Sequence, residues 1–153
     1  MRSTHQQRNA INPQSSVWVG ASAGTGKTKV LTDRLLTLLL NNTPPERILC
    51  LTFTKAAAAE MSERTAKILS TWVTDSEDAL RKKITDLLDK EPHHHELTKA
   101  RQLFARVIGA PGGMKVLTIH GFCQSVLKRF PLEAGLTPHF DLLTEEKKAQ
   151  LLS

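Results

Sequence analysis

One stretch of small, hydroxyl and basic residues has the composition and spacing needed to hold phosphate. It comprises Ala21, Ser22, Ala23, Gly24, Thr25, Gly26, Lys27 and Thr28. The spacing is typical of the phosphate-binding loop, GxxxxGK[ST], with alanine in place of the first glycine. Small residues let the backbone wrap closely, so that successive N–H groups point at phosphate oxygens, and a helix starting at Lys27 would add its positive end. An ordinary glycine-rich turn is the alternative interpretation, and a strand before the loop with a helix after it favours phosphate binding.

The last two residues of this loop suit separate chemical tasks. Lys27 is placed to reach the β- and γ-phosphates of a nucleotide, and the Thr28 hydroxyl is placed to ligate Mg²⁺. These two residues are the candidate catalytic groups, and Thr28 is the candidate metal ligand.

Two further polar clusters, residues 52–64 and 118–124, occur where an expected strand becomes a helix. The carboxyl edge of a parallel sheet is where ligands bind in such folds. In the first cluster, hydroxyl and ammonium groups could hold a phosphodiester backbone and an aromatic ring could stack on a base; these residues are Thr52, Thr54, Lys55 and Phe53. Alternatively, Phe53 belongs to the core and the alanines that follow simply favour a helix.

Histidines offer two weaker candidates. His120, in the second cluster, could act as a catalytic base, but without an Asp or Ser partner a hydrogen-bonding contact is the better interpretation. The triplet at residues 93–95 could bind a metal, but a solvated loop between helices is favoured.

The elements that must position these clusters alternate between strands and helices. We expect strands at residues 17–21, 47–53 and 115–119, and helices at 27–40, 56–72, 77–90, 96–108 and from His120 to just before Pro131. A polar lead-in with a turn occupies residues 1–16, and a further helix begins at Thr144. The second strand is apolar on both faces, as in a sheet covered by helices. This order predicts an α/β fold with a parallel sheet flanked by helices.

Composition and charge narrow the class of protein. The chain has 153 residues, of which 40% are hydrophobic, which suits one compact domain. Residues 1–55 hold seven basic and two acidic side chains, a balance that suits nucleotide or nucleic acid, although a solvated basic surface is the alternative. No apolar run is long enough to span a bilayer. The two distant cysteines are expected to be reduced, half-buried thiols in a cytoplasmic protein.

Taken together, the clusters resemble the amino-terminal motor segment of superfamily 1A DNA helicases, the UvrD/Rep group. Residues 7–10 resemble the Q motif, 21–28 motif I, 52–64 motif Ia and 118–124 motif Ib. Trp18 and Val19 before the loop, with residues 119–124 and 129–136, are similar to the RecB/AddA recombination helicase-nucleases. The last stretch, through Phe140, is similar to AddA of the alphaproteobacterial type.

The resemblance implies a RecA-like P-loop domain that takes ATP and Mg²⁺ and couples hydrolysis to translocation on single-stranded DNA. It also implies work on double-strand breaks beside an AddB-like subunit in the bacterial cytoplasm. By position, Gln7 would contact adenine, Lys29 would contact phosphate and Arg64 would approach the nucleotide. The DNA path would be lined by Thr52, Phe53, Thr54, Lys55 and His120. Gly121 stands where many relatives outside the RecB/AddA branch have serine.

A P-loop ATPase also needs a second acid at the end of a buried strand, and no apolar strand ending in Asp-Glu occurs in this sequence. Residues 1–153 are therefore expected to form the first part of the helicase ATP-binding domain. A second RecA-like domain and a nuclease domain have no counterpart here, so the chain alone is expected to be inactive as a motor. Two alternatives remain: a small P-loop phosphotransferase such as a kinase, and a stand-alone nucleotide- or DNA-binding module.

Overall fold

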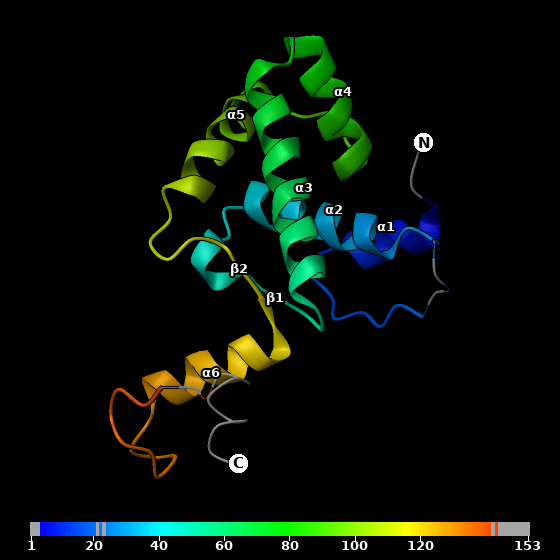
Figure 1. Cartoon of the computed structure of the whole chain (residues 1–153). Coiled ribbons are helices and arrows are strands. Elements are labelled where there is room, and N and C mark those ends of the chain that lie inside the picture. Colours follow the sequence, from blue (N-terminus) through cyan, green and yellow to red (C-terminus); the bar gives the residue numbers. More distant parts are fainter. Residues whose placement is uncertain (1–3, 21, 23, 142, 144–153) are drawn as a thin grey trace.

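The structure, a computed structural model, describes residues 4–20, 22, 24–141 and 143. Figure 1 shows helices gathered around a small sheet, with the last helix projecting away from the others. In chain order the elements are α1 (His5–Ile11), α2 (Lys27–Leu40), the 3-10 helix η1 (Pro45–Arg47), β1 (Leu49–Thr52), α3 (Lys55–Thr74), α4 (Glu77–Leu88), α5 (His94–Ile108), β2 (Lys115–Thr118) and α6 (Ile119–Arg129).

The sheet consists of β1 and β2, which pair in parallel. Leu49 lies opposite Lys115 and Thr52 opposite Thr118, so both strands end at the same edge. Three helices, α3 to α5, form the connection between the strands, as parallel pairing requires a long crossover. The α/β class and the parallel pairing are confirmed, within a smaller sheet than the three strands expected.

The main core lies between helices rather than on the sheet. Residues of α2, α3, α4 and α5 meet in one contiguous cluster, and its largest fully buried side chains are Leu39, Leu69, Trp72, Leu80, Ile84 and Leu103. Burying each of these side chains stabilises the fold by about 1.5–3 kcal/mol. The helical cluster therefore gives a rigid base to α2, which follows the phosphate loop, and to α3, which begins within residues 52–64.

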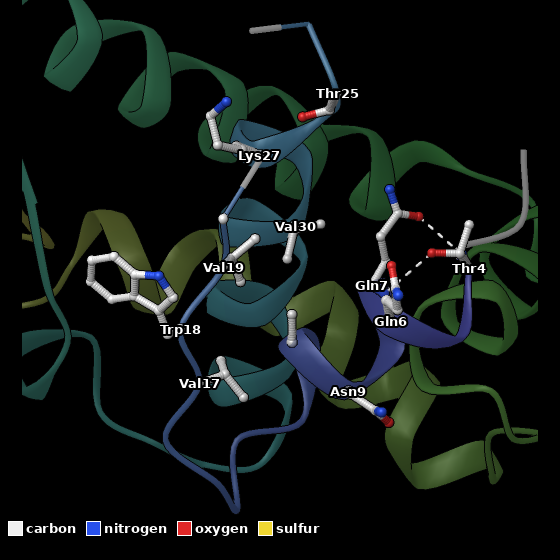
Figure 2. A pocket seen from close by; sticks show the side chains of 12 residues that line it. Thr4, Gln6, Gln7, Asn9, Val17, Trp18, Val19, Thr25, Lys27 and Val30 are labelled. Atoms are coloured by element: carbon white, nitrogen blue, oxygen red, sulfur yellow. Dashed lines mark hydrogen bonds between the residues drawn. The ribbon is translucent and has the colours of Figure 1, made fainter. Parts of the chain in front are cut away.

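The expected strand at residues 17–21 is wrong for the part that the structure describes. Residues 17–20 have no regular secondary structure, and Trp18 is 96% exposed. A strand exists only through hydrogen bonds to a neighbouring strand, and β1 is paired with β2 alone in the described sheet. Val17 and Val19 still lie on the side of α2, while Trp18 points to the other side (Figure 2).

The expectation that the second strand is covered on both faces is also wrong. Cys50 packs against the helical core, whereas Leu49 and Leu51 alternate with it and are 42% and 47% exposed. Side chains alternate between the two faces of a strand, so one face of β1 is covered and the other is open. Burial raises the pKa of the Cys50 thiol. Cys123 is exposed, which corrects the expectation of two half-buried thiols.

Helix boundaries agree with expectation where capping signals are clear. The bounds of α2 match, and α3 begins at Lys55 because the Thr54 hydroxyl accepts the Ala57 N–H at 3.1 Å. The helix expected at 96–108 begins at His94, and the His93 N–H donates to the Glu96 carboxylate at 2.9 Å. The helix start expected at Thr144 lies outside the described residues. Within the described part of the chain, no helix combines the length and apolar character needed to cross a membrane.

Helix α1 was not predicted, because it lies within residues 1–16, where a polar lead-in with a turn was expected. A capping box starts it: the Gln7 N–H donates to the Thr4 hydroxyl at 3.3 Å, and the Thr4 N–H donates to the Gln7 side-chain carbonyl at 3.0 Å. Ala10 and Ile11 are buried with Val30 of α2 in a second, small cluster. The helix therefore lies against the helix that follows the phosphate loop.

Candidate nucleotide and nucleic-acid site

The phosphate loop owes its shape to two glycines. Gly24 and Gly26 have φ angles of 79° and 87°, in the left-handed region where a side chain is strained. Gly26 is the residue before α2 and supplies no capping side chain. The N–H groups at the start of α2 and the helix dipole together favour an anion at this position. Ala21 and Ala23, both expected loop residues, lie outside the described residues.

The polar side chains of the loop converge on one backbone carbonyl. The Lys27 ammonium donates to the Ser22 carbonyl oxygen at 2.6 Å, and the Thr25 hydroxyl donates to the same oxygen at 2.7 Å. The Lys27 side chain thus lies across the loop, where its ammonium group could contact a phosphate held by the loop. This donor set fits a polyphosphate: an ammonium group and the backbone N–H groups of a glycine turn meet at a helix start.

The neighbours of Lys27 along α2 are held differently. Thr28 lies in the first turn, is exposed, and its carbonyl accepts the Thr32 hydroxyl at 2.8 Å. Its own hydroxyl is the group on this turn whose chemistry suits Mg²⁺. Lys29 forms an ion pair with Asp33 one turn further along α2.

Gln7 is brought to the phosphate loop by α1. A methyl group placed on Gly26 would lie 3.8 Å from the Gln7 Nε2 atom, and both Gln7 and Lys27 line one open cavity of about 500 Å³. Figure 2 shows the two side chains at different sides of this cavity, with Val30 between them. The cavity is also lined by Asn9, from the stretch that resembles the Q motif, and by Thr4 and Gln6, which the sequence did not single out. The signal that could have found Thr4 is the Thr-x-x-Gln capping box that it forms with Gln7.

The motif Ia and Ib clusters meet at the carboxyl edge of the sheet. Thr52 and Thr118 pair across the strands, and the Thr118 hydroxyl accepts the Gly121 N–H at 3.0 Å, so that α6 starts directly at this edge. Phe53 follows β1 and is 85% exposed, which excludes the interpretation of Phe53 as a core residue. Lys55 and His120, in the first turns of α3 and α6, are exposed at the same edge.

Two other candidates, Arg64 and the histidines at 93–95, support neither a nucleotide contact nor a metal site. Arg64 lies on α3, pairs with Glu60 at 2.9 Å, and is absent from the lining of the cavity beside Gln7. The rings of His93 and His95 stack with their centroids 5.7 Å apart. In the described ranges, no three side chains of the metal-ligating types gather into a metal-binding group.

Comparison with known protein families shows the family to which this chain belongs. The model of the UvrD/REP helicase N-terminal domain matches residues 3–153. The chain belongs to the UvrD/REP helicase N-terminal domain family. The Gln7, Lys27 and Phe53 segments all fall within the matched region of this UvrD/REP domain.

Curated relatives of this UvrD/REP domain are AddA proteins, described as subunits of an ATP-dependent helicase/nuclease. The chain is 39% identical over 150 residues to the proteins of Lactobacillus johnsonii and Lactobacillus gasseri, which covers 97% of this chain and 11% of each relative. It is 31% identical over 147 residues to the protein of Enterococcus faecalis, covering 96% of this chain and 10% of that relative. These relatives correct the expectation of an alphaproteobacterial type, since they come from lactobacilli and enterococci. The chain thus spans about a tenth of the length of these relatives.

Proposed function

We propose that this chain is the ATP-binding segment of a helicase/nuclease of the AddA type, in which it binds Mg²⁺-ATP and contacts single-stranded DNA. The observation that carries the proposal is that Gln7 and Lys27, from separate elements, line one cavity at a helix start. An isolated glycine-rich turn needs no second element beside it, whereas a nucleotide presents both a base and a polyphosphate.

The phosphate loop supplies binding and charge. Lys27 would exchange its bond to the Ser22 carbonyl for the β- and γ-phosphate oxygens, and backbone N–H groups of residues 24–28 would complete the cradle. The Thr28 hydroxyl would hold Mg²⁺, which when bound neutralises charge that develops on the phosphates. The Gln7 side-chain amide would donate a hydrogen bond to the adenine edge. Lys29 would contact a phosphate in place of its ion pair with Asp33.

DNA would run along the carboxyl edge of the sheet. Phe53 offers an exposed ring for stacking, and Lys55 and His120 offer charge and hydrogen bonds to the backbone. The Thr54 hydroxyl oxygen accepts the Ala57 N–H, which leaves the hydroxyl proton to donate to a phosphate. Thr52 lies at the strand end beside these groups.

The complete activity belongs to the longer protein. We propose that it couples ATP hydrolysis to translocation on single-stranded DNA, works with an AddB-like subunit in double-strand-break repair in the bacterial cytoplasm, and carries nuclease activity. The similarity to proteins described as ATP-dependent helicase/nuclease subunits supports this. The 153-residue segment provides the Q motif and motifs I, Ia and Ib.

Calorimetric titration of the chain with Mg²⁺-ATP tests the proposal. Lys27→Ala should weaken binding by about 1.5–3 kcal/mol, the range for a hydrogen bond to a charged group. Lys67→Ala is the matched control, because Lys67 is an exposed lysine on α3 and the change in net charge is the same. Equal affinity of the Lys27→Ala protein and the wild type would show that the loop does not bind triphosphate.

A further inference from the structure

The helix that carries Gln7 is too short to hold its own position. Helix α1 has seven residues, and isolated helices of that length are marginal in water. Its apolar contact with α2 is the small cluster of Ala10, Ile11 and Val30. Arg8 also forms an ion pair with Asp89, but both side chains are more than a third exposed, and such pairs contribute little. Something further must fix α1 against the phosphate loop.

Arg34 of α2 provides that attachment through three backbone carbonyls. Its NH1 group donates to the carbonyl of Ala10 at 2.9 Å and to that of Asn12 at 2.6 Å, and its NH2 group donates to that of Ser15 at 2.9 Å. Ala10 is in the last turn of α1 and Asn12 is its C-cap, so two of these acceptors are helix-end carbonyls without intrahelical partners. A guanidinium at a helix C-terminus also complements the dipole.

The side chain needed here is arginine in particular. A planar guanidinium presents several donors in a fixed fork, whereas a lysine ammonium is a single point of attachment. No carboxylate pairs with Arg34 among the ion pairs of the described residues, and the neighbouring Asp33 is engaged by Lys29. The guanidinium is therefore directed to the backbone that leads from α1 towards Val17.

This attachment fixes the distance between the base-contacting and phosphate-contacting parts of the site. Arg34 lies two turns after Lys27 on the same helix, and its acceptors begin three residues after Gln7. We infer that Arg34 is a positioning residue for base recognition: it holds α1 so that the Gln7 amide stays beside Gly26. The inference rests on the proposed nucleotide binding and adds a residue that sets the preference for adenine.

Titration calorimetry with three probes distinguishes positioning of Gln7 for base recognition from a purely structural role of Arg34. The probes are ATP, GTP and inorganic tripolyphosphate, each with Mg²⁺. In Arg34→Lys and Arg34→Gln, ATP affinity should fall roughly fivefold, the equivalent of one neutral hydrogen bond, while tripolyphosphate affinity stays unchanged. ATP and GTP should then bind alike. Arg81→Gln is the matched control, because Arg81 on α4 pairs with Glu77 and Glu91 away from the cavity.

Hydrogen exchange gives a second readout that does not depend on a nucleotide. In Arg34→Lys, which keeps the charge, amides of residues 8–12 should exchange faster while those of the core helix residues 80–88 keep their protection. If Arg34→Gln does not fold, Arg34→Lys carries both measurements.

Three results would overturn the inference. One is retention of the ATP preference in Arg34→Lys with unchanged exchange in α1. Another is an equal loss of ATP and tripolyphosphate affinity, which would indicate a structural role alone. The third is a wild type that binds ATP and tripolyphosphate alike. If Lys27→Ala still weakens binding in that case, the phosphate loop and the proposed function stand and only the role of Arg34 fails. A wild type that binds neither probe would overturn both.

Discussion

Thr52 and Thr118 lie opposite each other as the last residues of the two paired strands. Each is followed within three residues by a helix whose first turn is capped by a threonine hydroxyl, from Thr54 in one case and from Thr118 itself in the other. The pairing thus brings two helix starts that are far apart in the sequence to one edge. Helix starts attract anions, so this edge suits a phosphodiester backbone.

Removal of the Phe53 ring should weaken binding of single-stranded DNA by about 1–3 kcal/mol, the usual range for one stacked base. The fold should keep its stability, because the side chain is 85% exposed. Fluorescence anisotropy with a labelled oligonucleotide at low salt measures the loss in Phe53→Ala, and binding should weaken steeply as salt rises. Leu132→Ala is the control, since Leu132 is a 72% exposed apolar residue outside this edge. Equal binding by Phe53→Ala and wild type would remove the stacking role.

The isolated chain should show essentially no ATP turnover, with or without DNA. Phosphoryl transfer depends on positioning and charge stabilisation, and Lys27 and Thr28 supply only part of both. The two described strands end in Thr52 and Thr118, without an acid to hold Mg²⁺ and orient water. In the longer protein a second RecA-like domain is expected to supply an arginine finger, and such a finger alone is worth about 10³–10⁵ in rate. A phosphate-release assay, with Lys27→Ala as control for contaminating enzymes, checks this; DNA-stimulated turnover that vanishes in the control would contradict it.

The start of α5 should stabilise the fold in a pH-dependent way through Glu96. Its bond to the Lys90 ammonium, and then its bond from the His93 N–H, lower the pKa of the Glu96 carboxyl. A carboxyl whose pKa is lowered by folding stabilises the protein above its unfolded pKa of about 4.3, and this stabilisation is lost as the pH falls through the folded value.

Glu96→Gln should therefore lower the free energy of unfolding at pH 7 by roughly 0.5–1 kcal/mol and lower it less near pH 3, because the stabilisation is lost as the pH falls through the folded pKa. Urea denaturation at the two pH values measures the difference. Glu63→Gln is the control, because Glu63 is an exposed carboxylate on α3. A difference of the same size at both pH values would show that the amide, not the lost charge, is responsible.

The two cysteines should differ in reactivity towards a thiol reagent. Cys123 is exposed on α6, whereas Cys50 is half-buried against the helical core and its pKa is raised by burial. Because the thiolate is the reactive form, Cys123 should be modified first at pH 8 and Cys50 more slowly. Absorbance after addition of an aromatic disulfide should show two phases, of which Cys123→Ser abolishes the faster. Loss of the slower phase in that variant would contradict the assignment.

Local signals predicted much of this fold. The bounds of α2 followed from Gly26 and from the Asn-Asn-Thr-Pro-Pro stop, and the parallel pairing followed from the alternation of strands and helices. The segment at residues 17–20 has the apolar character of a strand, but pairing is a property of two segments, and its partner cannot be read from its own residues. Helix α1 was missed because its Thr4 and Gln7 capping signal is followed by only two buried apolar side chains.

The candidate site also has parts that could be predicted from the sequence and parts that could not. The phosphate loop and the motif Ia and Ib edge were predictable because each is a continuous stretch of chain. The cavity shared by Gln7 and Lys27, and the three carbonyls bound by Arg34, depend on segments that meet only after folding. Arg64 illustrates the converse: its place within the motif Ia stretch suggested the nucleotide, yet its side chain lies with Glu60 along α3.

The unpaired segment before the phosphate loop gives the chain a built-in optical probe. The sequence has two tryptophans and no tyrosine, and the two indoles sit in opposite environments: Trp18 is 96% exposed and Trp72 is 2% exposed. Acrylamide should quench the red-shifted emission of Trp18 and spare the blue-shifted emission of Trp72 within the helical core. The unquenched part therefore follows unfolding of the core, while the quenched part follows events at the phosphate loop, and one unlabelled sample reports both.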